Sequence, residues 1–505
     1  MKHVKIEPET VAVPPTPGSS AVNGEIAPDR PYTEPKVDWP DLLIWVAIGL
    51  FFLVMSRDVL SLHNNFWSFD YDLGIFDQAI WLMSRGEGFV TVRGLDVFGH
   101  HGSFAFYLLV PFYWLGAGPN FLNIVMVLSI CFAAWILFRY SRELTANGWW
   151  ALLLALAFLV HYTNSWQVRE TFHPEVVAMA PFMAGYVAAR DQRWKAFAVW
   201  MGLAITWKED IALAILMVGI LLVIRGFRRP GWITVVSSLT YFVLVTRILI
   251  PAFSDGVVFY ENFYGDLGAG PVDLARTVLT NPGAVGGTLV QHDFIGYVRD
   301  LLAPYAFVPL LSPLTLLIAL PQVLANLLTN VDWTQNLRVH YAAMPLAAAS
   351  LALVEEFARI KRNGTRRFAL GAVAAMSLAT AVAWGTLPFG VEYDQGIWPI
   401  YGNDRRTLLE AAVAMPGPAD EVTATYNLTP HLSRRRVIYT WPNPWRALHW
   451  GTGSEEPPDP SIIRWLVIDR TVLGDSAAEF ESVLDSEPWE VVMDQGGVLV
   501  ARRTP

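Results

Sequence analysis

Eleven apolar runs, separated by short polar connections, constrain what this chain can fold into. The first begins after Pro40 and ends before Arg57, and the others lie at roughly 119–138, 149–163, 175–189, 196–208, 211–225, 232–251, 299–311, 313–329, 341–354 and 368–387. A helix that crosses a bilayer needs about 20 mostly apolar residues. A composition of 53% hydrophobic and 16% charged residues is also too apolar for a soluble chain of 505 residues. The runs predict a polytopic α-helical membrane protein with about 11 transmembrane helices.

Basic residues mark alternate connections between these runs. They are Arg139 and Arg142, then Arg190, Arg193 and Lys195, then Arg225, Arg228 and Arg229, and finally Arg359, Lys361, Arg362, Arg366 and Arg367. Because Lys and Arg concentrate on the cytoplasmic side, we expect a protein of the cytoplasmic (inner) membrane with its N-terminus inside and its C-terminus outside. No charge separates the runs that meet near residue 312, and the predicted sides would be unchanged if both were re-entrant.

Composition divides the chain into three parts. Residues 1–40 are rich in Pro, Glu and Ser and predict a disordered cytoplasmic tail. Residues 41–387 form the transmembrane domain, with a large first outer loop at 58–118 that contains an amphipathic interfacial helix at 74–85 and a second juxtamembrane helix at 103–116. Residues 388–505 predict a small extracytoplasmic α/β domain. Its expected elements are the strands EVTATY, RRVIYTW and RWLVIDR, the helix SAAEFESVLDS, and a hairpin of WEVVMD and GVLVARR around Gly496 and Gly497.

Charge, cysteine content and motifs exclude several classes of protein. The net charge of -9 argues against a nucleic-acid partner, since duplex binding needs a clustered basic face. Cys131 is the single cysteine, so an intramolecular disulfide is excluded. The sequence contains no internal repeat and no Walker, Rossmann or zinc-protease motif.

Polar clusters gather at the predicted outer ends of the spans and in the outer loops. They are Asp70, Asp72 and Asp77; His100 and His101; His173 and Glu175; Lys208, Glu209 and Asp210; His292 and Asp293; and Gln335, Asn336, His340 and Tyr341. Such groups are costly in hydrocarbon and usually face a cavity or one another. Six clusters on one face suggest one site.

Each cluster also has a structural interpretation. Asp72 precedes a predicted helix and could cap its N-terminus, and His173 with Glu175 could cap the next span. Lys208 could pair with its acidic neighbours in a tight outer turn. A divalent metal ion would be compatible with these donors, but no spacing is diagnostic of one. Acid/base chemistry by a carboxylate is the simplest catalytic option.

Several motifs together resemble a known family. They are DLGIFDQAIW after the first span, His101 ahead of an apolar segment that reaches Pro111, then FHPE, WKED, and PQVLANLLTN followed by VHY. The sequence is similar, over roughly residues 55 to 440, to a family of multi-pass membrane proteins defined by a domain of unknown function. That family resembles the class C (GT-C) glycosyltransferases in layout: a first span, a large outer loop with an acidic residue, and a C-terminal outer domain.

The resemblance implies a reaction and roles for particular residues. In class C enzymes an Asp or Glu of the first outer loop is the base for the acceptor hydroxyl, and the donor is a sugar on a polyprenyl phosphate. The base would be Asp72 or, second, Asp70, although this chain has DYD where DE or DD pairs are common. Lys208, Arg57 or Arg169 could contact the lipid phosphate. The remaining residues expected to bind substrate are His101, His173, Glu175, Glu209, His340 and Tyr341.

Two functions therefore stand at this point. The first is a cell-envelope glycosyltransferase that moves a sugar from a polyprenyl-phosphate carrier to a glycan or lipid acceptor outside the cytoplasmic membrane. The alternative is a non-catalytic transporter or scaffold. A transporter should carry ionisable residues at the bilayer midplane on broken helices and often has repeated halves, and the sequence indicates neither.

Overall fold

Long apolar helices dominate the computed structural model, which describes residues 38–268, 271–394, 402–452 and 456–504. In these ranges five helices are long and apolar enough to cross a membrane: α1 (Trp39–Asn64), α5 (Pro119–Thr145), α11 continuing into α12 (Arg228–Ala252), α18 with its preceding turn (His340–Arg359) and α19 (Asn363–Trp384). A sixth span results if α6 (Gly148–Leu159) and α7 (Tyr162–Arg169), which meet at a 42° bend, are taken together. The tail expected at 1–40 lies, up to residue 37, outside the described residues.

The predicted count of eleven spans is not confirmed, because several apolar runs form shorter helices. These are α8 (Pro174–Arg190), α9 (Trp194–Ile205) and α10 (Ile211–Ile224), followed later by α15 (Phe294–Leu302), α16 (Pro313–Leu316) and α17 (Leu320–Leu327). Between α15 and α17 the chain breaks into short turns at Pro304, Pro309 and Pro313, and Pro321 lies in the first turn of α17. Proline lacks a backbone N–H and its ring clashes with the preceding turn. Hydropathy does not register such breaks, so the apolar runs at 299–311 and 313–329 do not form continuous helices.

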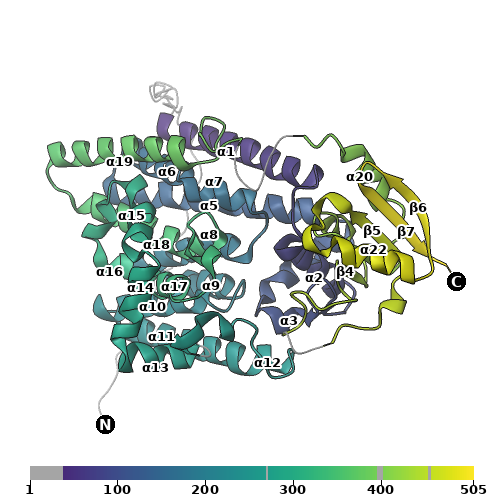
Figure 1. Cartoon of the computed structure of the whole chain (residues 1–505). Coiled ribbons are helices and arrows are strands. Elements are labelled where there is room, and N and C mark those ends of the chain that lie inside the picture. Colours follow the sequence, from purple (N-terminus) through teal and green to yellow (C-terminus); the bar gives the residue numbers. More distant parts are fainter. Residues whose placement is uncertain (1–37, 269–270, 395–401, 453–455, 505) are drawn as a thin grey trace, which may run out of the picture. The chain divides into compact units, whose positions relative to one another are not determined.

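Packing in the helical part centres on α18, whose side chains from Ala343 to Glu355 are all buried. α5, α8 and α17 contact α18, and α8 pairs with α9 (Figure 1). α10 and α11 approach closely because a side chain at Gly219 would lie 2.8 Å from the backbone nitrogen of Val235. Small residues at such crossings are typical of membrane helices. On its other side α11 exposes Trp232, Ile233 and Val236, as expected of a helix that faces lipid.

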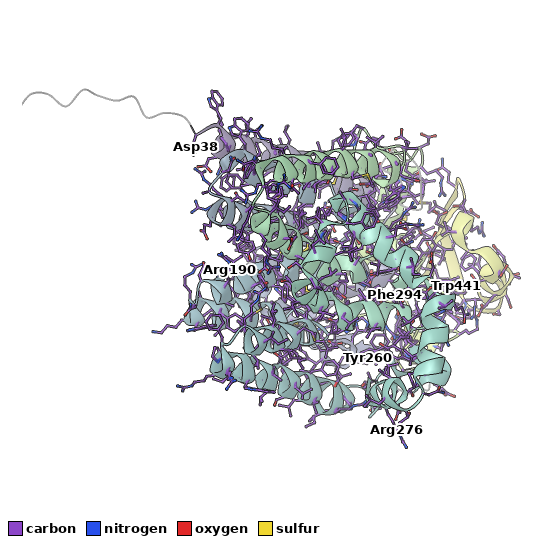
Figure 2. The ribbon with its side chains drawn as sticks, turned by 90° about the vertical axis from the view of Figure 1, so that its left-hand side faces the viewer. Asp38, Arg190, Tyr260, Arg276, Phe294 and Trp441 are labelled. Atoms are coloured by element: carbon purple, nitrogen blue, oxygen red, sulfur yellow. The ribbon has the colours of Figure 1, made fainter. Side chains whose placement is uncertain are left out.

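The two ends of the helical part differ in chemistry. Arg190, in the last turn of α8, lies at the opposite end from Tyr260, Phe294 and Trp441 (Figure 2). Trp441 belongs to the C-terminal domain. The basic connection at Arg190, predicted to be cytoplasmic, therefore lies far from that domain. The ring of His101 lies 6.3 Å from that of Tyr260, and His292 and Asp293 directly precede Phe294, so these two polar clusters belong to the end with Tyr260 and Phe294.

The first outer loop folds into short elements instead of two interfacial helices. They are η1 (Asp70–Gly74), α2 (Ile75–Met83), the strands β1 (Phe89–Val90) and β2 (Leu95–Asp96), α3 (Val97–His100), η2 (Phe104–Leu108) and α4 (Val110–Trp114). The helix expected at 74–85 is present as α2, but its polar residues Asp77 and Gln78 are completely buried. Its polar face is therefore covered by protein and does not lie on the membrane surface. η2 and α4 replace the helix expected at 103–116.

The C-terminal part is a five-stranded sheet with the order β4-β3-β5-β7-β6. Its strands are β3 (Val422–Ala424), β4 (Ile438–Thr440), β5 (Trp465–Asp469), β6 (Trp489–Gln495) and β7 (Val498–Arg503), accompanied by α20 (Arg406–Val413), α21 (Thr429–Leu432) and α22 (Ala477–Ser486). β3 is parallel to β4 and β5, and β7 is antiparallel to β5 and β6. The expected strands, helix and hairpin are confirmed. Gly496 (φ 55°) and Gly497 (φ 78°) supply the two positive φ angles that a tight hairpin turn requires.

Successive side chains of β5 point to opposite faces of the sheet, and both faces are covered. Leu466 and Ile468 belong to one hydrophobic cluster with Phe480 of α22, whereas Val467 belongs to a second cluster that includes Leu409 of α20, as the two-residue period of a strand requires. The sheet region also bonds to the first outer loop. The Ser433 hydroxyl donates to Asp77 Oδ2 at 2.6 Å, and Gln78 Nε2 donates to the Arg435 carbonyl at 3.1 Å.

Candidate functional site

Asp72 has an unusual backbone conformation at the start of the first outer loop. Its φ of 70° and ψ of -84° lie in a region that residues with a Cβ rarely adopt and that resembles a strained γ-turn. Asp72 precedes the helical residues that lead into α2, but the structure shows no hydrogen bond from its carboxylate to their backbone N–H groups among the described residues, and the carboxylate lies against His173 instead. The Asp72 side chain is 29% exposed and its carboxylate faces buried groups. Strain of this kind concentrates at functional sites.

His173 connects Asp72 to the buried carboxylate of Glu170. Its Nε2 lies 3.2 Å from Asp72 Oδ2 and 3.9 Å from Glu170 Oε1. His173 precedes α8, and its Nδ1 lies 3.1 Å from the Thr171 carbonyl, which orients the ring. Both ring nitrogens thus face acceptors, an arrangement that favours the protonated imidazole.

The same alternation of acidic and basic groups continues through His340. Its Nδ1 lies 2.7 Å from Glu170 Oε1, its backbone N–H donates to Glu170 Oε2 at 2.6 Å, and its Nε2 lies 3.7 Å from Glu175 Oε1. Glu175 in turn pairs directly with the Lys208 ammonium. The rings of His340 and His173 stack with centroids 3.8 Å apart. We call Asp72, His173, Glu170, His340, Glu175 and Lys208 the charge chain.

The surroundings of the charge chain determine its protonation. Burial would lower the pKa of His173, but the carboxylates of Glu170 and then Asp72 outweigh it and raise the pKa to about 9. Burial would raise the pKa of Asp72, yet the positive charge of His173, 3.2 Å away, holds it below its ordinary value. For Lys208, Glu175 overcomes burial and raises the pKa well above the usual range. At neutral pH Asp72 is a carboxylate, and His173 and Lys208 are cations.

Three further predicted residues flank the charge chain. The ring of Tyr341 lies under the Lys208 ammonium, 5.4 Å from its centroid. Glu209, next to Lys208, bonds to His101 Nδ1 at 2.9 Å and accepts from the backbone of Gly102 at 3.0 Å. The expected set His101, His173, Glu175, Lys208, Glu209, His340 and Tyr341 is thus brought together along the charge chain.

Asp70 and Asp77 are directed elsewhere. Asp70 forms a hydrogen bond with Thr440 of β4, and burial raises its pKa to about 6. Asp77 accepts from Tyr113 and from Ser433, each at 2.6 Å, and burial raises its pKa to about 6. Both carboxylates therefore connect the first outer loop to its protein neighbours and do not join the charge chain.

The two arginines considered for the lipid phosphate make their contacts elsewhere. Arg169, at the end of α7, is fully buried, donates to the Thr386 carbonyl at 3.2 Å and lies over the ring of Tyr393. Arg57 of α1 is exposed and donates to the hydroxyl of Tyr393 at 3.3 Å. Lys208 is therefore the predicted phosphate contact that lies in the charge chain.

The six polar clusters do not form one site. His292, Asp293, Gln335 and Asn336 line a groove apart from the charge chain. Glu170 lies at the centre of the charge chain, but it was not identified from the sequence as a candidate site residue. The signal for it was its place in RETFHPE, where an acidic residue follows a span and precedes His173 by three positions. Such a carboxylate at the end of a span needs a buried partner.

Part of the charge chain has the chemistry of a metal site. Glu170, His173 and His340 each offer a ligand atom, and these atoms lie within 4.8 Å of one another. Carboxylate and imidazole donors of this kind suit zinc and related ions. A ligating imidazole must be neutral, so a metal ion would have to displace the proton that the carboxylates stabilise on His173.

Comparison with known proteins places this geometry in a family and a fold. The family described as "Predicted membrane protein (DUF2079)" matches residues 62–500. No curated protein matches the sequence significantly. Crystal structures of ArnT from Cupriavidus metallidurans are similar to the chain: the form bound to undecaprenyl phosphate has 14% identity and a TM-score of 0.58, and the apo form 13% and 0.56. Each alignment covers 92% of this chain and 99% of ArnT. The chain thus has the GT-C fold of ArnT, with a small C-terminal sheet.

Proposed function

This chain belongs to the DUF2079 family of predicted membrane proteins, and we propose that it is a membrane glycosyltransferase. In this proposal it moves a sugar from a polyprenyl-phosphate donor to a glycan or lipid acceptor on the outer face of the cytoplasmic membrane, facing the C-terminal domain. The observation that carries the proposal is the position of Asp72: a strained, partly exposed carboxylate at the end of the charge chain. The fold shared with ArnT, which binds undecaprenyl phosphate, supports the choice of donor.

Asp72 is the base in the proposed reaction. The acceptor hydroxyl oxygen attacks the anomeric carbon, the bond from that carbon to the phosphate oxygen breaks, and the configuration inverts. As the new bond forms, the acceptor oxygen becomes positively charged and gives up its proton far more readily than a carboxylic acid does. A carboxylate with a low pKa can therefore still take the proton. The strained backbone fixes its direction.

Cationic groups of the charge chain support departure of the phosphate. The leaving polyprenyl phosphate keeps the electron pair of the broken bond, so negative charge grows on its oxygen. Lys208 and protonated His173 supply fixed positive charge nearby, and preorganised charges of this kind lower such barriers. Glu170 and Glu175 hold the two cations in place when no donor is bound.

The experiment uses the full chain in lipid nanodiscs with a panel of polyprenyl-phosphate pentoses, hexoses and amino sugars, and with glycolipid and glycan extracts as acceptors. Release of free polyprenyl phosphate is measured by mass spectrometry. Asp72→Asn should lower the rate by about 10²- to 10⁴-fold with donor binding unchanged, because the amide keeps the shape and cannot take a proton. Asp475→Asn, at an exposed position of the sheet domain, is the matched control and should keep the wild-type rate.

The same preparation tests the non-catalytic alternative. If no donor of the panel is consumed, or if Asp72→Asn and wild type release polyprenyl phosphate equally, the proposed mechanism is refuted. Passage of the lipid-linked sugar across a proteoliposome membrane without cleavage would identify a transporter.

A further inference from the structure

A groove of about 470 Å³ lies beside the charge chain and has no role in the proposed chemistry so far. α15 forms one wall, with its start marked by Phe294 in Figure 2. Asp332 and residues 335–338 also line it, and the end of α19 contributes Trp384. A volume of this size falls within the range of pockets that bind small organic ligands.

Three aromatic rings line the groove in fixed positions. Tyr162 meets Trp384 edge to face, with ring centroids 5.4 Å apart at 84°. The hydroxyl of Tyr297 accepts a hydrogen bond from Asn326 Nδ2 at 3.0 Å. Tyr162 and Tyr297 are only 4% and 5% exposed, so they support the wall from within, and the half-buried Trp384 is the ring that offers a face to a ligand.

Carboxylates and amides are the polar groups of the same groove. Asp293, Asp300 and Asp332 line it together with Gln335 and Asn336. Asp300 is paired with Arg299 at 2.7 Å. Among the described lining residues Arg338 is the one Lys or Arg, and its guanidinium lies 3.7 Å from Glu392 and over the ring of Trp166. The lining therefore carries an excess of negative charge.

This combination matches the chemistry of a saccharide. A sugar ring presents an apolar C–H face that packs on an aromatic ring and a rim of hydroxyl groups that donate to carboxylates and amides. The excess negative charge repels phosphorylated or carboxylated sugars and attracts amines. Neutral and amine-bearing saccharides fit both conditions.

One segment of the chain lines both the groove and the charge chain. Arg338 lies in the groove and His340 in the charge chain, and two residues span at most about 7 Å. Asn326 also joins the two, since its Nδ2 donates to the Tyr297 hydroxyl in the groove and to the carbonyl of Tyr341 beside Lys208. The groove and the charge chain are therefore neighbours.

We propose that this groove binds a neutral or amine-bearing oligosaccharide and that this oligosaccharide is the acceptor. The assignment as acceptor rests on the proposed glycosyltransferase function. Binding itself does not, because the aromatic and carboxylate lining recognises a saccharide whether or not transfer occurs. Asp72 then receives the hydroxyl at the end of the saccharide nearest His340.

Binding is tested without a donor, on the full chain in nanodiscs. Short cello-oligosaccharides, chitosan oligosaccharides and oligogalacturonates serve as neutral, amine-bearing and carboxylated probes, and their dissociation constants are measured by calorimetry. The neutral and amine probes should bind and the carboxylated probe should not. Trp384→Ala should weaken binding at least about tenfold through loss of ring contact. Trp333→Ala is the matched control, since this exposed Trp lies in the turn Asp332–Gln335 and is not one of the residues that line the groove.

Asp332→Arg covers the case in which Trp384→Ala fails to fold, because Asp332 is exposed. It should weaken the amine probe more than the neutral one. Preference for the carboxylated probe, no saccharide binding, or equal binding in wild type, Trp384→Ala and Asp332→Arg would overturn the proposal.

The outcomes separate the two proposals. Saccharide binding without sugar transfer in any assay would leave the groove assignment intact and refute the enzyme. Sugar transfer with a KM for acceptor that is unchanged in Asp332→Arg would retain the enzyme and refute the groove as its acceptor site.

Discussion

The backbone strain at Asp72 makes an unusual prediction: replacement by glycine should stabilise the protein relative to replacement by alanine. Both variants lose the carboxylate and its 3.2 Å contact with His173, so their difference isolates the backbone. A residue with a Cβ in such a region costs about 1–3 kcal/mol. Glycine avoids this cost but loses about 0.5–1 kcal/mol through the greater freedom of its unfolded chain. The free energy of unfolding of Asp72→Gly should therefore be about 1 kcal/mol higher than that of Asp72→Ala.

Denaturant titration in mixed micelles measures this difference, and the transfer assay runs on the same samples. Neither variant should transfer sugar. Asp475→Gly and Asp475→Ala are the matched pair, because Asp475 has no positive φ and lies in a short helical turn. There alanine should be the more stable. If alanine is also the more stable at position 72, the backbone there is not strained and the argument that connects strain to function fails.

Protonation, domain contacts and metal content give three further outcomes. The imidazolium of His173, with its pKa raised from 6.5 to about 9, contributes about 3 kcal/mol of stability that is fully present below pH 6.5 and is lost as the pH rises through about 9. Melting temperatures between pH 6 and 10 should fall in wild type and stay level in His173→Asn. Ser433→Ala should lower the free energy of unfolding by about 1–3 kcal/mol, since it leaves an oxygen of buried Asp77 unpaired; an unchanged value would mean that this bond does not hold the sheet. Chelator treatment should leave transfer unchanged, because a protonated His173 cannot ligate. Activity lost with chelator and restored by zinc would instead assign a metal ion to Glu170, His173 and His340.

The sequence was sufficient to predict the membrane class and the sheet region. Apolar runs identified α1, α5 and α19 because these helices have no internal proline and are long enough to cross a bilayer. Alternating residues and the two glycines at 496 and 497 identified the hairpin of β6 and β7. An apolar run and an alternating pattern are both formed by residues close together in the sequence, so the sequence alone is enough to recognise these elements.

What could not be predicted depends on contacts between distant segments. Asp72 and Asp70 are equivalent in the sequence, and only the turn at Asp72 directs one carboxylate to His173 and the other to β4. Glu170 becomes central because His340, 170 positions away, donates to it. The burial of α2 likewise follows from bonds to residues beyond 430. Periodicity describes one face of a helix and does not show which distant segment covers it.

The bonds between α2 and the sheet region also set an order for biosynthesis. Asp77 and its partner Ser433 are 356 residues apart, and ribosomes add about 5–20 residues per second. The carboxylate of Asp77 therefore waits roughly 20 to 70 s after its own synthesis before Ser433 has even been translated. During that interval the first outer loop holds polar groups without their final partners, beside an unfinished bundle. Chains interrupted before Ser433 should leave this loop accessible to proteases and chaperones. Completion of the first outer loop therefore depends on a segment that is translated much later.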